Sequence, residues 1–284
     1  MSELSREHDA RRIVVGLRSA SNAERAIAAA TVLASVIEAR IVGLFVQEEI
    51  MLDLAEFPFA RVLDFDKPQP RKVSRQSMNE AFVRTAAICR RTLSNHAGKA
   101  RVGWSFSTRQ GEFKATVEAE AGSGDYVVLS SETHGTGIRA LIDALRMMPA
   151  NVAGVVVAGI DGARRSSGPV VAIDDGDATG ARTVALAARL AAVEGKSLHL
   201  FAVAAADADA QRIQARAATL IGKGQTMVRH RYAPGSPQSI AAGIAHLSPF
   251  FVVGDLDGEP FRDDSVAIAV LRAAKAPVLL LRKI

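Results

Sequence analysis

Short apolar runs alternate along this chain with longer segments in which apolar residues recur every three or four positions. The first run, 13–19, precedes a helical pattern formed by Ala26, Ile27, Ala30, Leu33, Ala34 and Ile37. The run is typical of a buried β-strand, and the recurring pattern is typical of an amphipathic helix. Ser21 and Asn22 stand where a helix N-cap belongs. A second apolar run at 40–46 completes a β-α-β unit.

The same order of patterns returns in the second half of the chain. A strand-like run at 170–174 leads to a helical segment at 184–193 and to another run at 197–203. Val46 and Val203, 157 residues apart, then hold equivalent places in two copies of one unit. We therefore predict that the chain consists of two α/β domains in tandem.

The copies differ in length at one place. Residues 125–130 match 249–254, and 110–112 match 234–236, at a spacing of 124 residues instead of 157. The difference places an insertion in the first copy, at about 47–80.

Strands that alternate with helices at this spacing predict parallel strands with right-handed crossovers and helices on both faces. We expect domain 1 over 1–160, a linker over 161–168 and domain 2 over 169–284, each an open five-stranded parallel sheet. The predicted strands are 12–18, 40–46, 101–107, 125–130 and 154–160 in the first copy, and 169–174, 197–203, 226–232, 250–254 and 277–282 in the second.

The insertion mixes acidic and apolar residues and then turns into a helix from about Val73. The segment could form a lid, a surface for a partner, or a loop that covers its own domain, and we favour the last. The apolar residues available for this packing include Leu52, Phe57 and Phe59. One face of the predicted helix carries Met78, Phe82, Thr85, Cys89 and Thr92. The spacing of Cys89 to Val83 and Leu93 also suggests a buried structural thiol.

Composition narrows the class of protein. The net charge of +5 is spread along the chain and aromatic residues make up 5%, so we expect no nucleic-acid partner. The chain has one local basic cluster, formed by Lys67, Arg71, Lys72 and Arg75. We interpret this cluster as the solvent-exposed start of a helix and not as a nucleic-acid-binding patch. The polar start at 1–12 lacks a signal-peptide core, no apolar run approaches the ~20 residues of a membrane span, and the single cysteine forms no internal disulfide. We therefore expect a cytoplasmic protein that does not bind a membrane.

Ligands of parallel α/β sheets bind at the carboxyl ends of strands, which directs attention to the residues after each run. Two further segments carry a resemblance: Ser-Val-Ala-Ile-Ala-Val-Leu-Arg at 265–272, and Ala-Pro-Val-Leu-Leu-Leu-Arg at 276–282. Together with a strand that ends in an acidic residue and an Ala-rich helix, these segments resemble the universal stress protein (UspA-like) family over 12–160 and 169–284.

The resemblance implies an adenine nucleotide alpha hydrolase-like fold, with the two copies packed as a pseudo-twofold pair through their last strands. It also implies further homodimerisation, an unidentified protein partner, and ATP or AMP as the ligand. Nucleotide-binding members hold ATP with an acidic residue after the first strand and with a Gly-x2-Gly-x9-Gly-Ser/Thr loop after the fourth. Such glycines let backbone N–H groups approach the phosphates.

The second copy carries this pattern incompletely. Asp257 replaces the second glycine of the motif, and Asp264 replaces the last. The acidic side chains of this loop would repel a triphosphate unless a metal ion bridged the carboxylates and the phosphates. The resemblance assigns the nucleotide to Asp174, Val203, Gly254, Asp255, Gly258, Ser265 and Val266.

The first copy departs further from the family pattern. Leu17 stands where the acidic residue belongs, and no Gly-Ser pair precedes Pro149. Its remaining candidates for phosphate contacts are Ser130, Gly135, Gly137 and Arg139.

Other motifs fail on their context. The Gly-x-Gly-x-x-Ala segment at 135–140 lies in the fourth unit and not the first, and the six histidines lack the paired spacing of a metal site. We identify no catalytic residue and predict a non-enzymatic stress-response or regulatory binding module that senses an adenine nucleotide weakly through domain 2. The alternative is a metal-dependent ATP hydrolase or nucleotidyl transferase that uses Asp174, Gly254 and Ser265.

Overall fold

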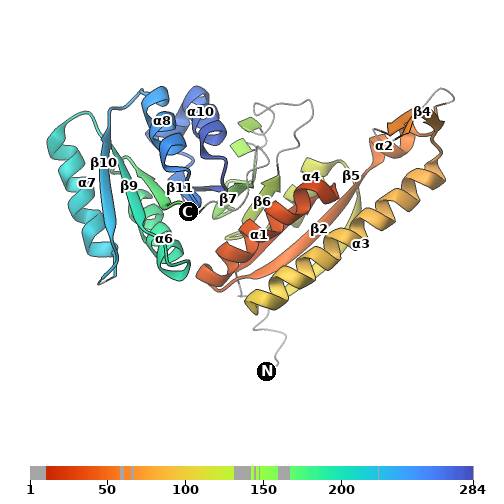
Figure 1. Cartoon of the computed structure of the whole chain (residues 1–284), viewed down its shortest axis with the longest axis horizontal. Helices are drawn as coiled ribbons and strands as arrows, with labels where there is room; N and C mark the ends of the chain where they lie inside the picture. Colours follow the sequence, from red (N-terminus) through yellow and green to blue (C-terminus); the bar gives the residue numbers. More distant parts are fainter. Residues whose placement is uncertain are drawn as a thin grey trace.

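A single ten-stranded sheet runs through the molecule in the order β10-β9-β8-β11-β12-β7-β6-β1-β2-β5 (Figure 1). The computed structural model describes residues 11–57, 61–64, 67–130, 142–143, 145–146, 148–158, 167–222 and 224–283. The strands of the first half are β1 (Arg12–Leu17), β2 (Arg40–Glu48), β5 (Trp104–Gly111), β6 (Tyr126–Ser130) and β7 (Gly154–Ala158). Those of the second half are β8 (Val170–Asp174), β9 (Leu198–Val203), β10 (Met227–Tyr232), β11 (Phe251–Asp255) and β12 (Val278–Leu281).

Each half repeats one topology. Within a half all neighbouring strands are parallel, and the strand that comes first in the copy lies at the centre. The last strands of the two halves, β7 and β12, pair antiparallel, with Val157 opposite Val278 and Gly154 opposite Leu281. The prediction of two five-stranded parallel sheets joined as a pseudo-twofold pair is confirmed. The domain bounds stay a prediction, because most of the expected linker lies outside the described residues.

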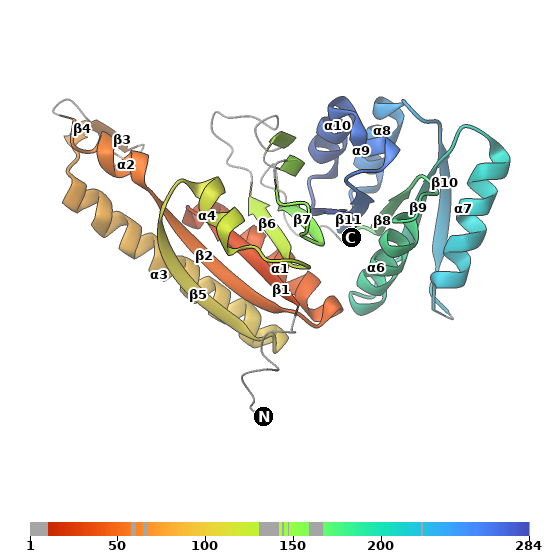
Figure 2. The ribbon, with the colours of Figure 1, turned by 180° about the vertical axis from the view of Figure 1, so that it is seen from behind.

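Helices cover both faces of the sheet (Figure 2). They are α1 (Ala20–Ile37), α2 (Glu49–Leu54), α3 (Arg75–Ala100), α4 (Phe113–Glu120), α6 (Gly180–Val193), α7 (Asp207–Leu220), α8 (Pro237–Leu247), α9 (Glu259–Arg262) and α10 (Asp264–Ala274). Side chains of α1, α3, α6 and α7 pack in the core of one face, and those of α4, α8 and α10 pack in the core of the other.

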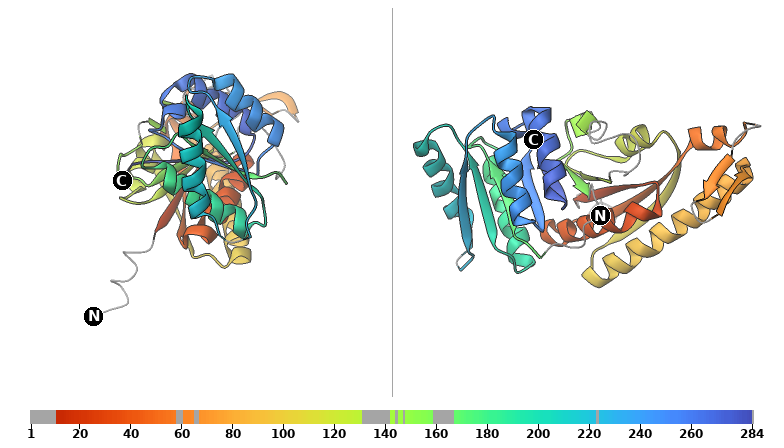
Figure 3. Two further views of the ribbon diagram at one scale, coloured as in Figure 1. Left: turned by 90° about the vertical axis from the view of Figure 1, so that its left-hand side faces the viewer. Right: turned by 45° about the horizontal axis from the view of Figure 1, so that its top comes forward.

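The central strands are buried on both faces, which explains their continuous apolar sequences. In β1, for example, Ile13 and Val15 enter one core and Val14 enters the other. Helix α1 is apolar around most of its circumference because it packs on the sheet and also contacts α3 and α6 (Figure 3). The α1–α6 contact joins the two halves a second time.

Predicted and observed strands agree closely in position, and the largest shift has a clear cause. The third strand of the first copy begins at Trp104 instead of 101. Helix α3 runs to Ala100, and Arg101 ends it in the left-handed conformation at φ 54°. The chain therefore cannot enter the sheet before it has left this helix.

The insertion forms α2, a hairpin of β3 (Arg61–Asp64) and β4 (Lys67–Lys72), and the first turns of α3. Figure 1 shows α2, the hairpin and this end of α3 together at one end of the molecule, away from the second half. Leu52 is buried but Phe57 is 60% exposed, so only part of the expected cover over its own domain forms. Phe59 lies outside the described residues.

Helix α3 confirms one part of the prediction for the insertion and corrects another. It begins one residue after Ser74, which forms a capping box with Ser77. Cys89 and Leu93 are fully buried, whereas Val83 is 58% exposed. Val83 was wrongly placed on the buried face, because at 3.6 residues per turn a spacing of six residues leaves it about 120° from Cys89. In the part of the chain that the structure describes, no helix combines the length and the apolar character needed to cross a membrane.

Candidate functional site

The candidate site lies at the carboxyl ends of the strands in the second half. Connections leave β8 toward β9 on one side, while β11 lies on its other side, so the strand order reverses between β8 and β11. Ligands of open α/β sheets bind in the crevice at such a reversal. Here β8 ends at Asp174 and β11 ends at Asp255, and two short loops follow them.

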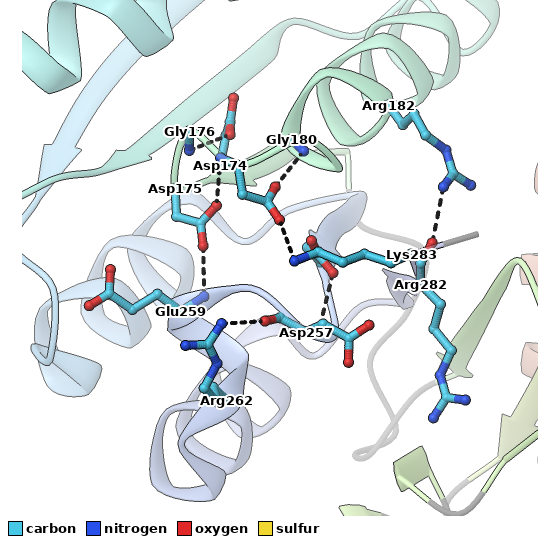
Figure 4. Close-up of polar contacts among 12 residues, drawn as sticks. Asp174, Asp175, Gly176, Gly180, Arg182, Asp257, Glu259, Arg262, Arg282 and Lys283 are labelled. Carbon is cyan, nitrogen blue, oxygen red and sulfur yellow. Dashed lines mark hydrogen bonds and ion pairs between the residues drawn. The ribbon is translucent and has the colours of Figure 1, made fainter. Parts of the chain in front are cut away.

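Asp174 is held by the protein itself (Figure 4). Its Oδ1 and Oδ2 accept hydrogen bonds from Nη2 of Arg216 at 2.8 and 2.9 Å, and Oδ1 also accepts from the Gly176 amide at 2.9 Å. The residue is 1% exposed, and burial raises its pKa above the ordinary aspartate value although these partners oppose the rise. A Cβ at Gly180 would lie 1.9 Å from Oδ1, so only glycine fits beside this carboxylate.

Two further carboxylates connect the β8 loop to other segments of the second half. Asp175 Oδ2 accepts a hydrogen bond of 2.6 Å from the Glu259 amide across the crevice. Asp177 Oδ1 accepts from the Gly180 amide at 2.8 Å, and its Oδ2 lies 3.4 Å from Nζ of Lys283. The crevice between β8 and β11 is therefore occupied by the chain's own side chains (Figure 4).

Asp255 completes this cluster from the β11 side. It is 4% exposed, its Oδ1 accepts from the Asp257 amide at 2.9 Å, and its buried Oδ2 has no hydrogen-bond partner among the described residues. Burial, followed by the neighbouring Asp177, raises the pKa of Asp255 to about 6.

Two adjoining cavities open beside the crevice, toward β9 and β10. Their volumes are about 410 and 530 Å³, and Val203 and Glu259 line both. The smaller cavity is also lined by Gly235, Ile240, Pro260, Arg262, Asp263 and Val266. The larger is also lined by Asp175, Gly176, Ala204, Ala205, Asp209, Arg212, Ile213, Arg216 and Pro234.

The cavity walls combine an apolar floor with charges of both signs. Val203 and Ile213 contribute apolar surface, and Arg212, Arg216 and Arg262 are also among the lining residues. All three arginines have partners: Arg216 binds Asp174, Arg212 binds Asp209, and Arg262 donates to the Asp257 carbonyl oxygen at 3.1 Å. Such a site suits a small ligand that carries an apolar or aromatic part and limited negative charge.

The structure brings some of the predicted site residues to the cavities and places others elsewhere. Val203 and Val266 line cavity walls, whereas Asp174 is not among the lining residues. Gly254 lies inside β11, where a Cβ would approach the Phe261 ring to 2.5 Å, so this glycine admits an aromatic ring. Asp255 lies in the crevice.

The remaining candidates also have local roles. Gly258 precedes α9, and the Ser265 amide donates to Asp263 Oδ1 at 2.8 Å in the first turn of α10. Ser130 is the half-buried last residue of β6. Gly135, Gly137 and Arg139 lie outside the described residues.

Sequence reasoning missed the arginines of α7 and one pair of histidines. Arg212 and Arg216 are four residues apart on a helix and so share a face, which was the one available signal. His199 Nδ1 and His230 Nε2 lie 3.0 Å apart because β9 and β10 are neighbours, although 31 residues separate them in the sequence. Burial lowers the pKa of both imidazoles. Within the described ranges, no three His, Cys, Asp or Glu side chains are placed to hold a metal ion.

Comparisons with known proteins identify solved structures that share this fold. The chain matches no protein-family model and no curated protein. It is similar in structure to a universal stress protein from Archaeoglobus fulgidus DSM 4304, with a TM-score of 0.61, 14% identity, and coverage of 96% of this chain and 99% of that chain. A candidate universal stress protein from Pseudomonas aeruginosa UCBPP-PA14 gives a TM-score of 0.54, 13% identity, and coverage of 96% and 94%.

A third similar structure is the cytoplasmic domain of a prokaryotic cation chloride cotransporter, with a TM-score of 0.54, 14% identity, and coverage of 96% and 95%. One architecture thus occurs in proteins with different printed descriptions, and the fold alone does not fix the function. The chain has the tandem α/β fold that is found in universal stress proteins.

Proposed function

We propose that this chain is a non-enzymatic regulatory binding module of the universal stress protein type, and that its second half weakly binds an adenine nucleotide, ATP or AMP. The observation that supports the proposal is the pair of cavities that meet at Val203 and Glu259, at the carboxyl ends of β9 and β11. Their apolar floor suits a base, and the arginines around it suit a phosphate.

The same geometry accounts for weak binding. The acidic residue that the family uses for its nucleotide, Asp174, is bound to Arg216, and this ion pair also occupies one of the cationic groups at the cavity. Asp175, Glu259 and Asp263 add negative charge to the walls. Because repulsion grows with the charge of the ligand, we expect AMP to bind more tightly than ATP.

The assembly and location of the protein are part of the same proposal. We expect a homodimer that acts in the cytoplasm through a protein partner, as the family resemblance implies. Light scattering of the purified chain measures the first of these: a monomer at micromolar concentration would contradict it.

A cavity-filling variant tests the binding site. Ligand at ten times its Kd stabilises a folded protein by about 1.4 kcal/mol, so AMP should raise Tm measurably at millimolar concentration. Val203→Trp places a large ring in both cavities and should abolish that shift. Val193→Trp, at a 57% exposed position at the end of α6, is the matched control and should keep it.

Three outcomes decide the matter. No co-purified nucleotide by mass spectrometry and no Tm shift with AMP, ADP or ATP would overturn nucleotide binding. An equal shift in wild type and Val203→Trp would place the ligand elsewhere. Multiple-turnover phosphate release from ATP, above the level of Val203→Trp, would replace the binding module with the metal-dependent hydrolase.

A further inference from the structure

Two histidines lie against each other at the edge of the sheet in the second half. His199 belongs to β9 and His230 to β10, which is the edge strand and has β9 as its neighbour. Nδ1 of His199 and Nε2 of His230 are 3.0 Å apart, and the two rings stack at 23° with their centroids 5.1 Å apart. Neither imidazole is among the residues that line the two cavities.

The register of the strands brings the two imidazoles together. His230 pairs with Phe201, and Val228 pairs with His199, so the histidines are diagonal neighbours across β9 and β10. Opposed residues of paired strands share a face of the sheet, and Phe201 belongs to the core that α8 and α10 cover. Both histidines therefore project from this face. Their separation of 31 residues hides the pair from a search for sequence motifs.

Aromatic contacts support the pair on one side and leave it open on the other. The Phe201 ring meets the His230 ring edge-on, with centroids 5.0 Å apart, and also packs on Tyr232 at 4.6 Å. The Tyr232 hydroxyl lies against α8. At the other end Val228, which is opposite His199, is 38% exposed, and both histidines are half-buried. The imidazoles are thus held by packing and accessible from solvent.

The facing nitrogens of the two rings have room for one proton between them. A neutral pair at this distance has one N–H group that donates and one lone pair that accepts. If each ring instead carries its proton on its outer nitrogen, two lone pairs face each other and attract a cation. This exchange moves one proton within one ring and releases none. Burial lowers the pKa of both imidazoles, which favours the neutral form that binds metal ions.

The spacing of the nitrogens discriminates between metal ions. At metal–nitrogen bonds of about 2.0–2.1 Å, two nitrogens at a right angle are about 2.9 Å apart, and two at a tetrahedral angle are about 3.4 Å apart. The observed 3.0 Å matches the right angle. Right angles are typical of tetragonal copper(II) and nickel(II), whereas zinc in structural sites is tetrahedral. Copper(II) also has the highest affinity for nitrogen ligands among the first-row divalent ions.

We propose that His199 and His230 form a binding site for a divalent transition-metal ion, with copper(II) bound most tightly. Nδ1 of His199 and Nε2 of His230 are the two protein ligands. In the described ranges no third His, Cys, Asp or Glu side chain joins them, so water fills the remaining positions. The ion joins the edge strand β10 to β9. This site is independent of any nucleotide bound at the carboxyl ends of the strands.

Titration of the full chain with Cu2+ at pH 7.5 tests the site. Electron paramagnetic resonance should show a tetragonal spectrum at one equivalent, and spin-echo modulation should count two imidazoles. His199→Gln and His230→Gln each leave one ligand and should weaken Cu2+ binding about tenfold or more. His246→Gln, at an exposed position on α8 in the same half, is the matched control and should bind as wild type does.

The two Gln variants remove different ligands, so either one that keeps the wild-type circular dichroism is sufficient for the test. Unchanged Cu2+ affinity in a folded Gln variant, or one imidazole in the wild-type spectrum, would overturn the paired site. Zn2+ binding as tight as Cu2+ binding would overturn the right-angled geometry.

Hydrogen exchange measured by mass spectrometry tests whether the ion joins the strands. Peptides that span β10 should exchange more slowly with Cu2+ bound, because the ion restrains the fraying of an edge strand. Peptides from β5, the edge strand at the opposite end of the sheet, are the internal control and should exchange at an unchanged rate. Equal slowing of β5 and β10, or no slowing of β10, would overturn the joining of the strands.

Discussion

At the scale of single residues, Arg216 determines what Asp174 can do. The carboxylate is at the end of a central strand, where the resemblance to universal stress proteins predicted an acid that contacts a nucleotide. Both of its oxygens instead accept hydrogen bonds from Nη2 of Arg216. The side chain of Asp174 is fully buried, and that of Arg216 is about one-third exposed. Because Asp174 is buried, the protein needs Arg216 to keep this carboxylate paired. An unpaired carboxylate here would destabilise the folded state by more than the ion pair stabilises it.

Replacing Arg216 should therefore destabilise the protein in a pH-dependent manner. We expect Arg216→Met to lower the free energy of unfolding by about 3 kcal/mol at pH 7, since it leaves a buried charge without its partner. The loss should shrink at pH 4, because an acid whose pKa is raised in the folded state can take up a proton there. Urea denaturation at both pH values measures the effect.

The neighbouring arginine provides the control. Arg212 lies one helical turn earlier on α7, and its side chain is 80% exposed in its pair with Asp209. Exposed pairs contribute about 0–1 kcal/mol, so Arg212→Met should change stability little at either pH. Equal losses for Arg216→Met at pH 7 and pH 4 would contradict the account of Asp174.

At the scale of elements, the sequence predicted strands well because the sheet is buried on both faces. Continuous apolar runs such as β1 and β12 have no exposed face to interrupt them, so their limits are visible in the sequence. The edge strands β5 and β10 carry weaker patterns, since much of their surface meets solvent. Even there, the repeat between copies located them within a few residues.

The candidate site was less predictable, for a physical reason. Asp174 was found from its place after a strand, but its partner Arg216 comes from α7, and the pairing depends on how that helix packs. The hydrogen bond from the Glu259 amide to Asp175 likewise joins two loops that are far apart in the sequence. Local patterns report strand ends, whereas the state of a carboxylate depends on contacts that only the folded chain creates.

Helix α3 offers a prediction at this scale. Leu93 is fully buried against the sheet, while Val83 on another face is 58% exposed. Leu93→Ala should lower the free energy of unfolding by about 2–5 kcal/mol, because it leaves a cavity in the core. Val83→Ala should change it by about 0.5 kcal/mol or less. Similar losses for the two variants in urea denaturation would place Val83 back on the buried face.

At the scale of the whole molecule, the two halves are joined by more than the β7–β12 pairing. Arg282, next to the end of β12, is 8% exposed and donates to four carbonyl oxygens, those of Leu145, Arg146, Met148 and Pro149. Arg146 in turn reaches into the second half and binds Asp264 at 2.7 Å. The two arginines cross the boundary in opposite directions, beside a loop that lines the smaller cavity.

These contacts predict that the halves unfold together. The single tryptophan, Trp104 in β5, reports on the first half by fluorescence, and far-ultraviolet circular dichroism reports on both. In wild type the two urea transitions should coincide, because neither half can lose the buried strand pair alone. Arg282→Met leaves four carbonyl oxygens without their charged donor and should cost about 3 kcal/mol.

The stabilisation that is lost belongs to the contact between the two halves. In Arg282→Met the fluorescence and dichroism midpoints should therefore separate. Arg272→Met is the matched control, because Arg272 is an exposed residue of α10 in the same half, and its transitions should stay coincident. If wild type already shows two midpoints, the continuous sheet does not couple the halves. If Arg282→Met is destabilised with coincident midpoints, the β7–β12 pair and the α1–α6 contact hold the halves together without the arginine, and the tandem is one cooperative unit in its absence.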